Sequence, residues 1–186
     1  MSRKQNTHGG GSKTTKLGKI YEKKFSLKKI LEAKYDAEQI KYQKKKEELY
    51  YLRIKENNKI IGYLTNQNYF NKHYLNLDDS SYRKILPKKL QPDEVFINEL
   101  NKTIYILEKK RQGGGGSVDE KLTTSDFKIK QYKKLINKTK NGYKVKLIYI
   151  LDTFFNVPLY EDHLNYIKDS GCEYSFSKIE LSKIGL

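Results

Sequence analysis

Two short segments rich in β-branched and aromatic residues most strongly limit how this chain can fold. They are 94–100 and 103–107, and the Asn101-Lys102 step between them suits a tight turn. Strand-forming residues on both sides of a turn-forming pair predict that this part of the chain is an antiparallel β-hairpin.

Charged residues lie at the open end of the predicted hairpin, before its first strand and at the end of its second. Side chains of a strand alternate between its faces, so Glu108 and Lys110 share one face and Lys109 points to the other. Asp93 and Glu108 are about equally far from the turn in sequence, so antiparallel pairing brings their carboxylates together. Two carboxylates repel each other unless a cation lies between them, and Mg²⁺ prefers such oxygen ligands. The sequence therefore predicts a Mg²⁺ site, with a surface hairpin that merely has polar ends as the alternative.

Taken together, Pro92-Asp93 and Glu108-Lys109-Lys110 resemble the PD-(D/E)XK signature shared by many type II restriction endonucleases. The resemblance implies an α/β fold with a restriction-endonuclease-like mixed β-sheet flanked by helices. It also implies Mg²⁺-dependent hydrolysis of phosphodiester bonds in double-stranded DNA by a metal-activated water. In that mechanism Asp93 and Glu108 bind the metal, the Lys109 carbonyl is a further ligand, and Lys110 activates the water or neutralises charge on phosphorus.

Further features fit this resemblance. Family members carry a glutamate on their first helix, and Glu22 resembles it, so Glu22 is an expected outer metal ligand. Glu120 is the alternative for this outer position. Family members also place a helix behind the signature, and 125–136 suits one, with Ser125 as its N-cap. Its apolar stripe consists of Ile129, Tyr132, Leu135 and Ile136. The glycine-rich segment 113–117 before this helix is either a native loop that lets the backbone approach DNA or a flexible linker.

The chain is strongly basic, with a formal net charge of +16 from 38 Lys+Arg and 22 Asp+Glu. A field of this sign suits a polyanion, so double-stranded DNA is the expected partner, although the codon bias of an AT-rich genome also raises the lysine content. The expected DNA contacts are Lys44, Lys45, Lys46, Arg111 and Gln112, with a solvated face as the alternative for the lysine run.

Carboxylates gather in one region of this basic chain and predict an acidic pocket where a metal and a phosphate share a site. They are Asp93, Glu94, Glu99, Glu108, Asp119 and Glu120.

We expect one nuclease domain over 15–186, preceded by a disordered basic arm at 1–14. Residues 15–58 are predicted to be helical, with two helices or one curved helix over 27–52. Residues 59–186 are predicted to hold the catalytic sheet and its flanking helices. The expected elements there, besides the hairpin and the helix behind it, are strands at 59–64, 143–151 and 172–176 and a helix at 159–168 that ends before Gly171.

Cysteine and histidine usage bears on metal chemistry and location. The single cysteine, Cys172, excludes an internal disulfide and is expected to be a small buried residue at a strand start. The three histidines are dispersed, so a zinc site is not expected. No apolar run is long enough for a membrane span, and the N-terminus lacks the apolar core of a signal peptide. We therefore expect a cytoplasmic protein without a membrane partner.

The source of DNA specificity stays open at the level of sequence. The chain has room for one catalytic domain and no evident recognition domain. Specificity is therefore either built into the loops of the chain or supplied by another subunit. The second case resembles the small cleavage subunits of heterodimeric type IIS enzymes, whose large partner recognises the site and nicks the other strand. A self-sufficient homodimer is the close alternative. Two other functions also fit the residues: a non-catalytic basic DNA-binding module, whose carboxylates only cap strand ends, and a nuclease specific for DNA junctions or flaps.

Overall fold

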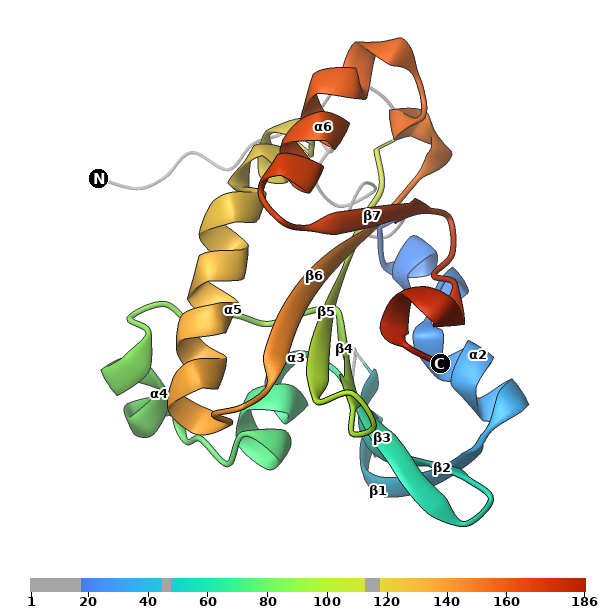
Figure 1. Cartoon of the computed structure of the whole chain (residues 1–186), viewed down its shortest axis with the longest axis vertical. Helices are drawn as coiled ribbons and strands as arrows, with labels where there is room; N and C mark the ends of the chain where they lie inside the picture. Colours follow the sequence, from blue (N-terminus) through green and yellow to red (C-terminus); the bar gives the residue numbers. More distant parts are fainter. Residues whose placement is uncertain (1–17, 45–47, 113–117) are drawn as a thin grey trace, which may run out of the picture.

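The computed structural model describes residues 18–44, 48–112 and 118–186. Its centre is a seven-stranded sheet in which the strands lie side by side in chain order (Figure 1). The strands are β1 (Asp36–Lys44), β2 (Glu48–Glu56), β3 (Lys59–Thr65), β4 (Glu94–Asn98), β5 (Thr103–Lys110), β6 (Lys144–Leu151) and β7 (Glu173–Phe176). Neighbouring strands from β1 to β5 are antiparallel, whereas β5, β6 and β7 run parallel. The prediction of an α/β fold with a mixed sheet is therefore confirmed.

Helices cover both faces of this sheet. The helical segments are 18–24, α2 (Leu27–Lys34), α3 (Gln67–Tyr69), η1 (Phe70–Tyr74), α4 (Asp79–Ile85), η2 (Asp119–Thr124), α5 (Ser125–Thr139), η3 (Thr153–Phe155), η4 (Pro158–Tyr160), α6 (Glu161–Asp169) and η5 (Leu181–Ile184). Helices α4, α5 and α6 share the larger hydrophobic core with one face, and α2 and η5 share a second core with the other. Figure 1 shows α5 and α2 on opposite sides of the sheet. No helix among the described residues is both long and apolar enough to cross a lipid bilayer.

Strand β6 explains why the sheet needs helices on both sides. Its second half is continuously apolar, and successive residues enter different cores: Tyr149 packs in the larger core, while Ile148 and Ile150 pack in the second. All three side chains are fully buried. A strand of this kind is stable only when it is covered on both faces, as the sequence predicted.

The predicted hairpin is formed by β4 and β5. Glu94 lies opposite Leu107 at its open end, and Asn98 lies opposite Thr103 next to the turn. Lys102 closes the turn with a positive φ of 51°. This register brings the residue before β4 close to the end of β5, which is the relationship that the candidate site requires.

The prediction that residues 15–58 are helical is wrong beyond Lys34. The chain forms two antiparallel strands, β1 and β2, where one or two helices were expected. In β2 the buried positions are Tyr50, Leu52 and Ile54, which is the period of two of a strand and not the period of a helix. The lysine run falls at the end of β1, and its members Lys45 and Lys46 lie outside the described residues.

The later elements follow the predictions closely. Helix α5 buries the whole expected stripe. The N-cap prediction is wrong by one residue, because Thr124 precedes the helix and the buried Ser125 hydroxyl donates to the Leu122 carbonyl instead. Gly171 has a φ of 71° after α6, as expected of a helix stop, and Cys172 is buried just before β7. The arm at 1–14 and the glycine-rich segment 113–117 lie outside the described residues.

Candidate active site

The hairpin brings the predicted site residues together at its open end. The Lys110 Nζ atom lies 2.7 Å from Oε2 of Glu108 and 3.5 Å from Oδ2 of Asp93. It also donates to the Lys109 carbonyl at 3.2 Å. Three oxygen atoms from the predicted metal ligands therefore surround one cationic nitrogen.

Burial and neighbouring charges set the protonation of this group. The backbone N–H of Lys109 donates to Oδ2 of Asp93 at 2.7 Å and so orients that carboxylate. Burial raises the pKa of Asp93 above its ordinary value, although Lys110 opposes this effect. Burial acts the same way on Glu108, but the Lys110 and Lys128 ammonium groups outweigh it and lower the pKa of that carboxyl. Burial alone would lower the pKa of Lys110, whereas the two carboxylates raise it above the ordinary value. Lys110 is therefore a stable cation in this arrangement.

Lys128 is a member of the site that the sequence analysis missed. It comes from α5, and its Nζ atom lies 3.0 Å from the same Glu108 oxygen that Lys110 contacts. Its ammonium also lies 5.8 Å from the centre of the Tyr149 ring. Lys128 precedes the buried Tyr132 by four residues, so both lie on the sheet-facing side of α5. This four-residue spacing from Tyr132 was the signal in the sequence that could have identified Lys128.

The opposite face of the hairpin carries a second charged pair. Lys109 forms an ion pair with Glu94 at 2.5 Å, and both side chains are almost completely buried. The Lys109 ammonium also donates to the backbone carbonyl of Glu22 at 3.0 Å. One side chain thus ties the helix at 18–24 to the strand that carries Glu108.

Glu94 also fixes the start of α2. Its carboxylate accepts hydrogen bonds from the Ser26 hydroxyl at 2.5 Å and from the Leu27 backbone N–H at 2.9 Å. The Tyr50 hydroxyl donates to it as well. Burial raises the pKa of Glu94, but Lys109 and these hydrogen bonds outweigh it, so the net shift is downward. Glu94 lies in a pocket with Asp93, as expected, and it is held there as a buried structural anion.

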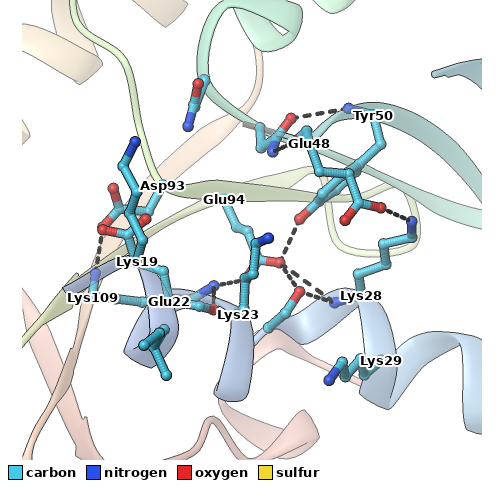
Figure 2. A pocket seen from close by; sticks show the side chains of 14 residues that line it. Lys19, Glu22, Lys23, Lys28, Lys29, Glu48, Tyr50, Asp93, Glu94 and Lys109 are labelled. Carbon is cyan, nitrogen blue, oxygen red and sulfur yellow. Dashed lines mark hydrogen bonds and ion pairs between the residues drawn. The ribbon is translucent and has the colours of Figure 1, made fainter. Parts of the chain in front are cut away.

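The two predicted outer ligands have different surroundings. Glu22 and Asp93 line the same pocket, whose volume is about 320 Å³ (Figure 2). Glu120 lies exposed in η2, where its backbone N–H donates to Asp119. Glu120 is not among the residues that line this pocket. The pocket therefore brings Glu22, and not Glu120, to the side of Asp93 where an outer ligand is expected.

The predicted acidic pocket is smaller than expected. Glu99 lies at the turn end of the hairpin, where it pairs with Lys102 and accepts a hydrogen bond from Tyr143. Glu99 and Glu108 therefore lie at opposite ends of the hairpin, almost the length of β5 apart. The carboxylates that do gather at the open end are Asp93, Glu94 and Glu108, and each faces a lysine.

The predicted DNA contacts are only partly accessible. Lys44 is exposed at the end of β1. Arg111 is half-buried and lies 3.6 Å from Asp152. Gln112 is 7 % exposed, so its side chain is poorly placed to reach DNA directly.

No family model matches this sequence, and no curated protein matches it. Within the described ranges, no three side chains of the His, Cys, Asp and Glu types come together as a metal-binding group. The candidate ligands are instead two carboxylates and one backbone carbonyl. Such a set suits Mg²⁺, which completes its shell with water and substrate phosphate.

Proposed function

We propose that this chain is a Mg²⁺-dependent endonuclease of the PD-(D/E)XK type that cleaves double-stranded DNA. One observation carries the proposal: Asp93, Glu108 and the Lys109 carbonyl converge on the ammonium of Lys110. A position where three oxygens already stabilise a positive charge is well suited to a metal cation.

The residues would share the chemistry as follows. Asp93 and Glu108 hold the metal with the Lys109 carbonyl, and Glu22 supports the outer side. The bound Mg²⁺ would polarise the scissile phosphate and lower the pKa of a coordinated water. Lys110 would leave its place between the carboxylates and approach the phosphate oxygens. Because its pKa is raised, its first contribution is to stabilise negative charge on phosphorus.

The net charge of +16 supports DNA as the substrate. The position of the cut would be chosen in one of two ways. Either a large recognition and nicking subunit delivers the chain to its site, or two copies of the chain act as a homodimer. Assays of cleavage by the purified chain, alone and with the product of a neighbouring gene, separate these two cases.

A test of the proposal compares Asp93→Asn and Glu108→Gln with the unchanged chain in a plasmid-cleavage assay with Mg²⁺ or Mn²⁺. Both variants should lose cleavage, because each removes a charged metal ligand. Asp126→Asn is the matched control, since Asp126 is half-buried on α5 and pairs only with Lys130 among the described residues. Cleavage that persists in both site variants contradicts the proposal.

A non-catalytic DNA-binding module is the second candidate. It is favoured by the charge balance of the group, because Lys110 and Lys128 neutralise Asp93 and Glu108 without any metal. This candidate predicts DNA binding without cleavage under all the conditions above. Branched and flapped DNA in the same assay test the remaining alternative, a structure-specific nuclease.

A further inference from the structure

The pocket that Glu22 and Asp93 share extends well beyond these two residues. Its walls come from the helix at 18–24, the start of α2, the start of β2 and residues 66–67, which follow the end of β3. Figure 2 shows Asp93 and Glu22 at one end of the pocket and the ion pair of Lys28 with Glu48 at the other. A volume of about 320 Å³ is at the lower end of the range of sites for small ligands. The pocket therefore begins at the proposed metal site and has room for one compact group.

Two lysines on the helical side of this pocket have no counter-ion among the described residues. Lys23 and Lys29 are both exposed and line the pocket. Within the described part of the chain, neither side chain forms an ion pair or a hydrogen bond, whereas Lys28, which lies between them in sequence, is paired with Glu48 at 2.8 Å. They come from different helices and are labelled in Figure 2. Two ammonium groups beside one opening suit an anionic ligand such as a phosphodiester.

Gln67, in the wall of the pocket that residues 66–67 form, has an unusual backbone conformation. Its φ is 43°, in the left-handed region that a residue with a side chain rarely adopts. Its backbone N–H donates to the carbonyl of Pro92 at 2.8 Å, which fixes this conformation next to Asp93. Backbone strain of this kind is unfavourable and persists where the surroundings hold it. Gln67 lines the pocket, and a side-chain amide can both donate and accept hydrogen bonds.

We infer that this pocket binds one nucleotide unit of the cleaved DNA strand, next to the scissile phosphate. Lys23 and Lys29 contact the phosphates of that unit, and Gln67 contacts its base or sugar edge. The position of the unit relative to the cut rests on the proposed function. Strand binding in the pocket does not, because it requires the lysines and the amide and no cleavage.

Fluorescence anisotropy with a short labelled single strand and its duplex, in Ca²⁺ without Mg²⁺, tests the lysines. The slope of log K against log salt is negative, and each lost phosphate contact makes it less steep by about 0.7 for a single strand and about 0.9 for a duplex. The variant Lys23→Gln/Lys29→Gln should therefore reduce the steepness by about 1.4 for the single strand and about 1.8 for the duplex. The control Lys59→Gln/Lys134→Gln alters two exposed lysines outside the pocket and should leave the slope unchanged. Equal slopes in the pocket variant and the unchanged chain, or an equal loss in the control, overturn the inference.

Gln67→Gly tests the amide without adding strain, because glycine adopts a positive φ readily. We expect unchanged or higher thermal stability and about fivefold weaker strand binding, from the loss of one hydrogen bond. Unchanged binding would remove Gln67 from the site. A deoxynucleoside 5′-monophosphate that binds as tightly as the strand would also overturn the inference, since it would identify a free-nucleotide site. If cleavage survives Asp93→Asn but the slopes change as expected, the proposed function fails while the strand site stands.

Discussion

Glu94 and Lys109 form an ion pair with 2 % and 3 % exposed side chains on the face of the hairpin opposite Glu108 and Lys110. Neighbouring residues of one strand thus belong to two charged groups with different surroundings. The Glu94 pair is enclosed by α2 and β2, whereas Lys110 is 16 % exposed. The first group joins the α2 side of the molecule to the hairpin, and the second is more exposed.

Removal of one partner from the buried pair should destabilise the fold severely. We expect Glu94→Gln to lower the free energy of unfolding by about 3–5 kcal/mol, because Lys109 would remain buried without its counter-ion. Urea unfolding followed by circular dichroism measures the change. Glu173→Gln is the control: its pair with Lys146 is exposed, and its loss should cost about 1 kcal/mol or less. Similar losses in both variants would contradict the structural role of Glu94.

The same carboxyl should make stability sensitive to acid. The pKa of Glu94 is lowered in the folded state from an ordinary value of 4.5. Its contribution is therefore fully present above about pH 4.5 and is lost as the pH falls through the lower, folded-state pKa. The free energy of unfolding of the unchanged chain should fall more steeply with acidification below this pH than that of Glu94→Gln. Parallel curves for the two proteins would show that Glu94 is not the acid-sensitive group.

The position of the hairpin beside β3 depends on a glycine. A Cβ atom at Gly62 would lie 2.3 Å from the Ile97 carbonyl oxygen of β4 and 2.9 Å from the Phe96 ring. Gly62→Ala should therefore disturb the pairing of β3 with β4 and lower the free energy of unfolding by about 1–3 kcal/mol. Gly18→Ala is the control, since among the described residues no atom outside its own helix turn lies within 4 Å of its added Cβ. Chemical denaturation of both variants measures the difference, and equal stabilities would refute the prediction.

The sequence was most informative where local signals and tertiary packing agree. The hairpin was predicted because strand-forming residues and a turn-forming pair coincide, and its register then brings Asp93 to Glu108. Strands β1 and β2 were mistaken for helices because lysines and tyrosines between the apolar residues obscure the alternation. There the pairing of β2 with β3 decides the conformation, and propensity alone does not reveal it.

The site was predicted incompletely for a similar reason. Glu94 stands next to Asp93 in sequence, but the alternation of a strand sends the two carboxylates to different surroundings. Lys128 reaches Glu108 only because α5 packs across β5 and β6, which is a tertiary relationship. Both residues could be assigned roles only after the packing was known.

The two lysines on Glu108 lead to the final prediction. Lys128 and Lys110 contact the same Oε2 atom, at 3.0 and 2.7 Å. If a metal takes that carboxylate, Lys128 loses its partner, and a phosphate oxygen becomes the nearest anion that it can neutralise. Lys128→Gln should therefore bind Mg²⁺ about fivefold more tightly, because one competing cation is gone. It should also lower the turnover of DNA by about 100-fold, because charge developing on the phosphate loses a stabilising group.

Calorimetric titration with Mg²⁺ measures the first effect of Lys128→Gln, and single-turnover cleavage of plasmid DNA measures the second. Lys130→Gln is the control on the same helix, because its side chain is 69 % exposed and pairs only with Asp126 among the described residues. That variant should change neither quantity. A lysine that only neutralises Glu108 would, when removed, tighten Mg²⁺ binding and leave turnover intact. Tighter Mg²⁺ binding together with slower turnover would therefore show that Lys128 contacts the substrate, and tighter binding alone would show a structural role.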